Sequence, residues 1–199
     1  PINDLGEILL DEFSSLITDK TKLVSFNYIS NSLGTINPVR EMISTVRKNS
    51  KAKILIDAAQ AISHIKIDVQ ELDCDFLAFS GHKMFGPTGV GVLFGKKDLM
   101  ENTSPLFGGG DMIDKVSFEK TTYNVLPQKF EAGTPHIAGI IAWRHAFDFI
   151  SKIGFEKIQE HENALRDYAI KRLAEVSSLQ IIGESKNKAA IMSFIMKGL

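Results

Sequence analysis

The chain has 199 residues, of which 44% are hydrophobic and 24% are charged, so its composition is that of a folded globular protein and not of a disordered one. With 23 Lys and Arg against 24 Asp and Glu, the net charge is -1, which gives no reason to expect binding to nucleic acid or to a membrane surface. The single cysteine excludes an intrachain disulfide framework and fits a reduced compartment, so we expect a cytoplasmic protein.

Hydrophobic periodicity predicts alternating helices and strands in the first half of the chain. In chain order, we expect a helix, a strand, a second helix, two buried strands and a returning strand, at residues 4–16, 23–29, 39–49, 53–58, 76–80 and 89–94. Pro38 suits the first turn of the second helix. The stretch 59–72 is expected to be irregular and partly helical. This alternation indicates an α/β layer with a mostly parallel sheet.

The second half of the chain changes in style, from glycine-rich loops to helices followed by strands. We expect loops at 108–110 and 130–135, helices at 137–153 and 156–176, and strands at 179–182 and 189–196. The helix at 137–153 is apolar on more than one face, so its aromatic residues are expected in the core. The change of style predicts a large domain at residues 1–150 and the start of a small domain at 151–199.

The two ends of the chain favour a segment of a longer protein. The chain starts at Pro1 and stops directly after a strand-like run, so we expect it to be a central piece. The acidic N-terminal stretch lacks the basic and then apolar order of a signal peptide. No apolar run approaches the roughly 18–20 residues that a transmembrane helix needs.

Polar side chains gather at the ends of two of the expected strands. Asp57 ends one apolar strand, and Gln60 follows it closely. The next strand ends at Ser80, and His82 and Lys83 come directly after it. Because ligands of α/β sheets bind at the carboxyl ends of parallel strands, we expect these side chains to face one crevice. No metal site is expected, because the histidines lack the spacing of metal ligands.

This set of side chains suits pyridoxal phosphate. A lysine can form a Schiff base with an aldehyde, a carboxylate can keep a pyridine nitrogen protonated, and hydroxyl, imidazole and backbone donors can hold a phosphate. Pyridoxal phosphate requires all three together. Taken one by one the features are weak, since an Asp at a strand end is usually a loop cap, and GPTGVG lacks the spacing of a nucleotide P-loop.

Longer motifs in the chain resemble one known family. The stretches VSFNYISNSLGTINPV, ILIDAAQAISHIKIDVQELDCDFLAFSGHKMFGPTGVGVLF, GGGDMI and FEAGTP resemble the cysteine desulfurases of the SufS type, which are class-V aminotransferases. The resemblance implies a fold-type-I pyridoxal phosphate enzyme, with pyridoxal 5'-phosphate as cofactor and a homodimeric assembly. It also implies conversion of L-cysteine to L-alanine, with the sulfur held as an enzyme persulfide and passed to an acceptor protein for iron–sulfur cluster assembly.

The resemblance assigns a role to each matching residue. It implies that Lys83 forms the Schiff base, that Asp57 pairs with the pyridinium nitrogen and that Gln60 bonds the ring phenolate oxygen. The other matching residues would bind the phosphate or line the pocket: Ser80 and His82 at the phosphate, Asn31 at the cofactor and substrate, and Thr134 at the phosphate of the neighbouring subunit.

The resemblance implies that the family's persulfide cysteine and its substrate-binding arginine belong to regions outside this chain. Cys74 matches a structural position of the family, so we expect a small buried residue with a raised thiol pKa, and a chain that is inactive by itself. His64 is expected to be a loop or packing residue. Two alternatives stay open: a selenocysteine lyase or other class-V lyase or aminotransferase, and a non-catalytic folded segment or interaction module.

Overall fold

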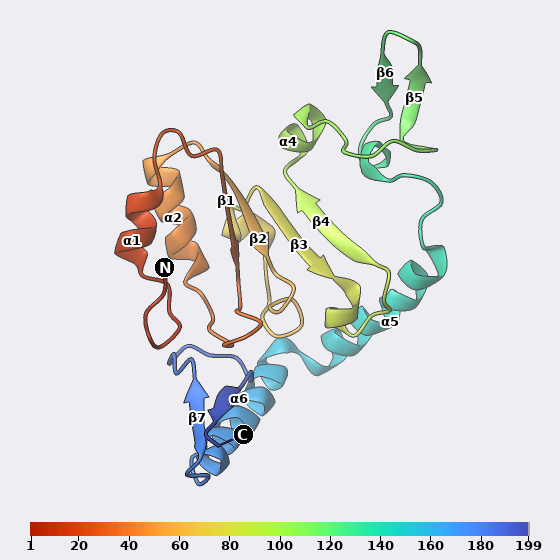
Figure 1. The fold of residues 1–199 in the computed structure, drawn as a ribbon. Helices are drawn as coiled ribbons and strands as arrows, with labels where there is room; N and C mark the ends of the chain where they lie inside the picture. The colour runs from red at the N-terminus through yellow and green to blue at the C-terminus, as the bar shows by residue number, and fades with distance from the viewer. Residues whose placement is uncertain (199) are drawn as a thin grey trace.

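A four-stranded sheet lies at the centre of the computed structural model, which describes residues 1–198 (Figure 1). In spatial order its strands are β1 (Leu23–Asn27), β2 (Lys53–Asp57), β3 (Phe76–Ser80) and β4 (Gly91–Gly95). The first three strands are parallel, and β4 returns antiparallel to β3. The predicted α/β layer with a mostly parallel sheet is therefore confirmed.

The alternation of side chains gives this sheet one covered face and one open face. Ile54, Ile56 and Leu77 are buried in the core beneath α2 (Val39–Asn49). Helix α1 (Leu10–Leu16) lies beside α2 (Figure 1). Side chains on the opposite face are half-buried or exposed, and the one of Leu93 is exposed. The strands are therefore held in place mainly from the α2 side.

The remaining elements continue the chain beyond the sheet. The short helices are α3 (Val69–Leu72), η1 (Gly81–Met84), α4 (Lys97–Asn102) and η2 (Gln128–Phe130). Strands β5 (Ile113–Val116) and β6 (Thr121–Tyr123) form an antiparallel hairpin, which projects from the body of the molecule (Figure 1). The C-terminal part contains α5 (Ile137–Ile153), α6 (Phe155–Leu173), β7 (Leu179–Ile182) and β8 (Ser193–Met196), the last two paired antiparallel.

Helix α5 packs beneath the carboxyl end of β3. Its buried residues Trp143, Ala146 and Ile150 form a second apolar cluster with Met84 of η1. The bend between α5 and α6 is at Gly154, whose φ of 88° suits glycine. Within residues 1–198, no helix is both long enough and apolar enough to cross a membrane.

The first predicted helix is shorter than its apolar spacing indicates. We expected residues 4–16, whereas α1 begins at Leu10. The Oδ1 atom of Asn3 accepts hydrogen bonds from the backbone N–H groups of Leu5 and Glu7, and these bonds form a turn in place of helical bonds. The N-terminal end of the prediction is therefore wrong, because a polar side chain competes for the backbone.

Two predicted strands are also too long. The strand expected at 23–29 ends at Asn27, because Ile29 forms an isolated bridge with Ile36 across the following loop. The strand expected at 189–196 begins only at Ser193. In addition, α4 and the β5–β6 hairpin were not predicted. Their side chains are mostly polar and exposed, so they lack the apolar periodicity on which the prediction depends.

Candidate functional site

The carboxyl ends of β2 and β3 lie side by side. Asp57 is the last residue of β2, and it is opposite Ala78 in the parallel register with β3. The backbone N–H of Ala58 donates to the carbonyl oxygen of Ala78 at 2.9 Å. Since side chains two residues apart on a strand share a face, Asp57, Ala78 and Ser80 lie on the same face of the sheet. The neighbouring strand ends are as expected, and a shared crevice stays a prediction.

Asp57 is exposed at this edge of the sheet. Its Oδ1 atom accepts a hydrogen bond from the backbone N–H of Ala59 at 2.9 Å, at the start of the turn that follows β2. The turn continues to Gln60, whose side chain is half-buried. Because the carboxylate of Asp57 is open to solvent, it keeps much of its hydration and the charge is not costly.

Helix η1 (Gly81–Met84) carries His82 and Lys83 directly beyond β3. The backbone N–H of Gly81 donates to the carbonyl oxygen of Val90 at 2.9 Å. A Cβ atom on Gly81 would lie 2.6 Å from Cγ2 of Val90, so only glycine fits where the chain leaves the strand. The His82 side chain is exposed and the Lys83 side chain is half-buried.

The polar side chains at this edge have almost no partners within the protein. Apart from the Asp57 contact just described, no hydrogen bond or ion pair within residues 1–198 involves the side chains of Asp57, Gln60, Ser80, His82 or Lys83. One carboxylate, one amide, one hydroxyl, one imidazole and one amine are therefore available to a ligand. We call these five residues the strand-end set.

The two remaining predicted residues lie in loops. Asn31 is exposed in the loop after β1. The last residue of β1, Asn27, is the register partner of Asp57. Thr134 is exposed in the loop before α5, near His136, whose ring lies 3.3 Å from where a Cβ on Gly89 would be. Within the described chain, neither side chain is hydrogen-bonded to the strand-end set. The roles expected for both residues stay predictions.

Asn37 is a structurally important residue that sequence reasoning missed. It is buried, and its Nδ2 group donates to the backbone oxygen of Asn27 at 2.8 Å and to Oδ1 of Asn27 at 2.9 Å. Asn27 is the register partner of Asp57. These bonds hold the loop that carries Asn31 against the carboxyl end of β1. The sequence pattern assigns a role only to Pro38, at the start of the following helix, and gives no sign of the bonds that Asn37 makes.

Two other residues have the structural roles that were expected. Cys74 is fully buried, and burial raises the pKa of its thiol, with smaller contributions from the carboxylates of Asp75 and Asp73. His64 is half-buried in the loop after β2, and its Nδ1 atom lies 2.7 Å from Oε1 of Glu162 in α6. Neither residue belongs to the strand-end set.

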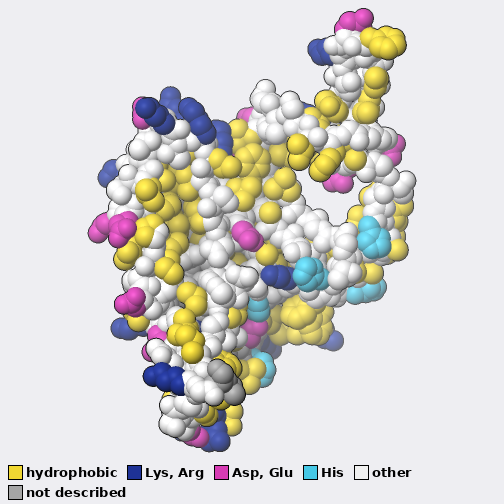
Figure 2. Space-filling model, viewed as in Figure 1, with side chains coloured by type: hydrophobic (Ala, Val, Ile, Leu, Met, Phe, Trp, Pro, Cys, Tyr) yellow, Lys and Arg dark blue, Asp and Glu magenta, His cyan; other side chains and the backbone are white. Residues whose placement is uncertain are grey.

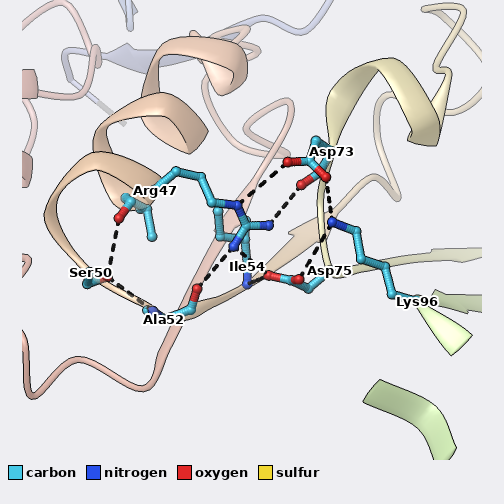
Figure 3. Close-up of polar contacts among 8 residues, drawn as sticks. Arg47, Ser50, Ala52, Ile54, Asp73, Asp75 and Lys96 are labelled. Atoms are coloured by element: carbon cyan, nitrogen blue, oxygen red, sulfur yellow. Dashed lines mark hydrogen bonds and ion pairs between the residues drawn. The ribbon is translucent and has the colours of Figure 1, made fainter. Parts of the chain in front are cut away.

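The opposite end of β2 and β3 is also charged, but there the charges are paired (Figure 3). Asp75 precedes β3 with a side chain only 5% exposed, and it accepts a hydrogen bond from the backbone N–H of Ile54 at 2.8 Å. Nη1 of Arg47, in the last turn of α2, lies 2.9 Å from Oδ2 of Asp75. Lys96, directly after β4, lies 3.9 Å from Asp75 and bonds Asp73. This ion-pair cluster (Arg47, Asp73, Asp75 and Lys96) ties α2, β2, β3 and β4 together.

The strand-end set has the donor and acceptor groups that pyridoxal phosphate needs. Oδ2 of Asp57 has no partner in the described chain and is open to solvent, as a partner for a protonated ring nitrogen must be. The Lys83 amine is free to meet an aldehyde, and Ser80 and His82 offer donors for a phosphate. No residue of the set would have to break a side-chain contact to hold the cofactor in this way.

Comparison with known proteins gives a consistent result. The chain matches the aminotransferase class-V family over residues 1–199. It is 46% identical to the cysteine desulfurase of Synechococcus elongatus over 198 residues, which are 100% of this chain and 32% of that protein. It is also 46% identical to a probable cysteine desulfurase of Halalkalibacterium halodurans over 194 residues, which are 98% of this chain and 47% of that protein.

Solved structures share the same fold. The cysteine desulfurase CsdA of Escherichia coli has a TM-score of 0.92 at 33% identity, over 100% of this chain and 49% of that chain. The apo cysteine desulfurase of Thermococcus onnurineus has the same TM-score and identity, over 100% of this chain and 50% of that chain. These matches confirm the predicted fold-type-I architecture. The chain spans about a third to a half of the length of the curated relatives it matches. Since the family match covers every residue of the sequence, the chain belongs to the class-V aminotransferase family.

Proposed function

We propose that this chain forms the cofactor-binding part of a pyridoxal phosphate-dependent cysteine desulfurase, which converts L-cysteine to L-alanine. One observation carries the proposal: Asp57 ends β2 and Lys83 follows the adjacent parallel strand β3, and neither Nζ of Lys83 nor Oδ2 of Asp57 has a partner within residues 1–198. The family match supports the cofactor, and the relatives called cysteine desulfurase support the substrate.

Each residue near the cofactor ring has a distinct task. Bound pyridoxal phosphate would supply an electron sink for the negative charge that develops at the substrate Cα. Asp57 would accept a hydrogen bond from the protonated ring nitrogen and stabilise its positive charge. Gln60 would donate its amide N–H to the ring oxygen. The amine of Lys83 would hold the cofactor through its aldehyde and, when released, would move a proton at the substrate Cα.

The phosphate would be held by the other members of the strand-end set. Ser80 and His82 would donate from the hydroxyl and the ring N–H. The glycine-rich loop after η1 adds backbone N–H groups, and Gly89 has a φ of 79°, which favours glycine. Asn31 would line the cofactor and substrate pocket, and Thr134 would reach the phosphate of a second subunit.

Cys74 is not the sulfur acceptor in this proposal. A thiol that takes sulfur from cysteine must be a thiolate beside the substrate. Cys74 is buried at the opposite end of β3 from Lys83, and its pKa is raised. The persulfide would therefore form on a different thiol, from which sulfur would pass to an acceptor protein of iron–sulfur cluster assembly.

The surface supports a homodimer. Large apolar side chains are exposed along the loop before the β5–β6 hairpin and on the first turns of α5: Leu106, Phe107, Ile137, Ile140 and Ile141. Figure 2 shows hydrophobic side chains on the projecting hairpin and over the sheet. Exposed apolar surface of this extent is typical of a protein interface, so we assign it to a second copy of the protein.

Two further assignments belong to this proposal. The bend at Gly154 supports a large domain at residues 1–150 and the start of a small domain at 151–199. The neutral charge and the single cysteine support a cytoplasmic location.

Reduction with borohydride tests the assignment of Lys83. The purified protein is incubated with pyridoxal phosphate, reduced and mapped by peptide mass spectrometry. We expect a phosphopyridoxyl group on Lys83 and on no other residue. Lys53→Ala is a matched control, since Lys53 lies at the start of β2 and should not affect labelling. Labelling that is spread over surface lysines and unchanged in Lys83→Ala would contradict the proposal.

Activity tests the substrate. Because we expect the chain to be inactive by itself, alanine and sulfide released from L-cysteine are measured with the loaded full-length protein that contains this segment, and selenocysteine is tested as a competing substrate. Release from cysteine supports a desulfurase. Release only from selenocysteine, or from neither substrate by a full-length protein labelled at Lys83, would point to another reaction of the class-V family.

A further inference from the structure

Helix η1, which carries Lys83, has little structure of its own to hold it. It is a single 3-10 turn of four residues, Gly81–Met84. Short 3-10 turns have weaker hydrogen-bond geometry than α-helices, so tertiary contacts decide their orientation. The turn closes through the backbone N–H of Gly86, which donates to the carbonyl oxygen of Gly81 at 2.9 Å. Phe85, which directly precedes Gly86, has a φ of 55°, which is unusual for a bulky side chain.

Trp143 of α5 supplies such a tertiary contact. Its Nε1–H donates to the backbone oxygen of Met84 at 3.4 Å, and the contact is buried. The carbonyl of Met84 lies at the end of the turn, where helical carbonyls lack partners within the helix. The indole therefore satisfies a buried backbone acceptor that directly follows Lys83 in the chain.

The same indole packs closely against the backbone of Gly86. A Cβ atom on Gly86 would lie 2.3 Å from Cδ1 of Trp143 and 2.5 Å from its Nε1. The other parts of the indole contact two aromatic rings: Phe79 of β3 at 5.9 Å and Phe147 of α5 at 5.2 Å between ring centroids. Trp143 is only 5% exposed. One side chain thus connects α5, β3 and the C-terminal end of the lysine-bearing turn.

We propose that Trp143 is a positioning residue for Lys83: its indole holds the Met84 carbonyl and the Gly86 backbone, and through them sets where the lysine amine lies. The inference rests on the proposed function, because it gives Lys83 a cofactor to meet. Trp143 does not touch the cofactor. Its effect reaches the reaction only through the backbone of η1.

Two substitutions separate the parts of this contact. Trp143→Phe keeps an aromatic ring but removes the N–H donor, whereas Trp143→Leu removes both. Ile150→Ala is the control, because Ile150 is buried in the same apolar cluster of α5, two helical turns away. It creates a cavity in that cluster without removing the indole contact with η1.

The first readout is the rate at which borohydride traps the cofactor on Lys83 at limiting pyridoxal phosphate. A displacement of the amine by about 1 Å is enough to slow such a reaction greatly, so we expect about a tenfold lower rate in Trp143→Leu and a smaller loss in Trp143→Phe. The second readout is the pH midpoint of the visible absorbance of the bound cofactor. We expect this midpoint to shift in both Trp143 variants and to stay unchanged in Ile150→Ala.

A third readout needs no substitution of Trp143. Trp143 is the single tryptophan of the 199-residue chain, so the intrinsic emission of the chain reports on this contact. We expect cofactor binding to quench this emission, and we expect Lys83→Ala to reduce the quenching at equal cofactor concentration.

The outcomes separate this inference from the proposed function. If the wild-type protein is trapped on Lys83 but the Trp143 variants match it in rate and pH midpoint, the positioning role is wrong and the function stands. The same conclusion follows if Ile150→Ala shifts the midpoint as much as Trp143→Leu. If the wild-type protein is not trapped on Lys83, the proposed function fails. Should Trp143→Leu not fold, the trapping rate and the pH midpoint of Trp143→Phe decide whether Trp143 positions Lys83.

Discussion

The two ends of β2 and β3 carry similar charged groups in opposite arrangements. At the start of the strands, Asp75 is buried and paired with Arg47 and Lys96 (Figure 3). At the carboxyl end, Asp57 and Lys83 are a carboxylate and an amine without ion-pair partners in the described chain. Paired charges hold elements together, whereas free charges at a strand end are available to a ligand. Stability and the proposed function thus belong to different ends of the same sheet.

Lys83→Ala should have the largest effect on the functional end. We expect complete loss of covalent cofactor trapping, because no other amine belongs to the strand-end set. The free energy of unfolding should change by less than about 0.5 kcal/mol, since the side chain has no partner in the described chain. Urea unfolding without cofactor measures this change. A large loss of stability would show that the carboxyl end of β2 and β3 also contributes to the stability of the fold.

Asp75→Asn should have the largest effect on stability. The substitution removes the negative charge of Asp75, with which both Arg47 and Lys96 are paired. We expect the free energy of unfolding to fall by about 3 kcal/mol. The measurement is urea unfolding at neutral pH. Asp73→Asn is the matched control: its carboxylate belongs to the same cluster but is exposed, so the loss should stay below about 1 kcal/mol. Equal losses in the two variants would show that burial does not decide the outcome.

Asp57→Ala should affect turnover but not folding. We expect the variant to keep part of its cofactor, because Lys83 and the phosphate contacts remain. Turnover should fall at least about a hundredfold, since nothing else would keep the ring nitrogen protonated. Steady-state release of alanine from cysteine by the full-length protein that contains this segment measures the loss, with cofactor content determined in the same sample. Turnover like that of the wild-type protein would contradict the electron-sink role.

The smallest expected effect is a pH dependence at the paired end. A hydrogen bond from Lys96 lowers the pKa of Asp73 below its ordinary value of 3.8. The pKa is lower in the folded state, so the pair contributes stability above the unfolded pKa and loses it as the pH falls through the folded pKa. The stability difference between the wild-type protein and Asp73→Asn should therefore be small at pH 6 and shrink further below pH 4. A stability difference that grows as the pH falls would contradict a lowered pKa of Asp73.

The central sheet was predictable because its sequence signals are local. Strands β2 and β3 are compact apolar runs, and α2 has apolar residues at helical spacing after Pro38. The neighbouring positions of Asp57 and Ser80 followed from the rule that parallel strands end at the same edge. These parts of the fold and of the candidate site required no knowledge of distant contacts.

The parts of the structure that sequence reasoning missed depend on long-range contacts, which a periodic sequence pattern does not predict. Arg47 and Lys96 meet Asp75 from elements far apart in the sequence. Trp143 was expected only as a core residue. The acceptor of its N–H is the backbone oxygen of Met84, and every residue has a backbone oxygen, so the sequence does not indicate which one is bound. The polar β5–β6 hairpin was missed for the related reason that it buries little apolar surface of its own.

The antiparallel return of β4 makes the lysine-bearing turn the tip of a loop that is closed at its base. The backbone N–H of Lys96 donates to the carbonyl oxygen of Asp75 at 3.0 Å, and the side chains of the two residues are paired. Closing this loop costs its ordering entropy during folding, before any cofactor arrives. Amide protons of β3 and β4 should exchange with deuterium only by global unfolding, and those of residues 81–90 by local opening. Cofactor binding should then slow exchange at this tip, so that the ligand completes the folding of one small segment on an already rigid base.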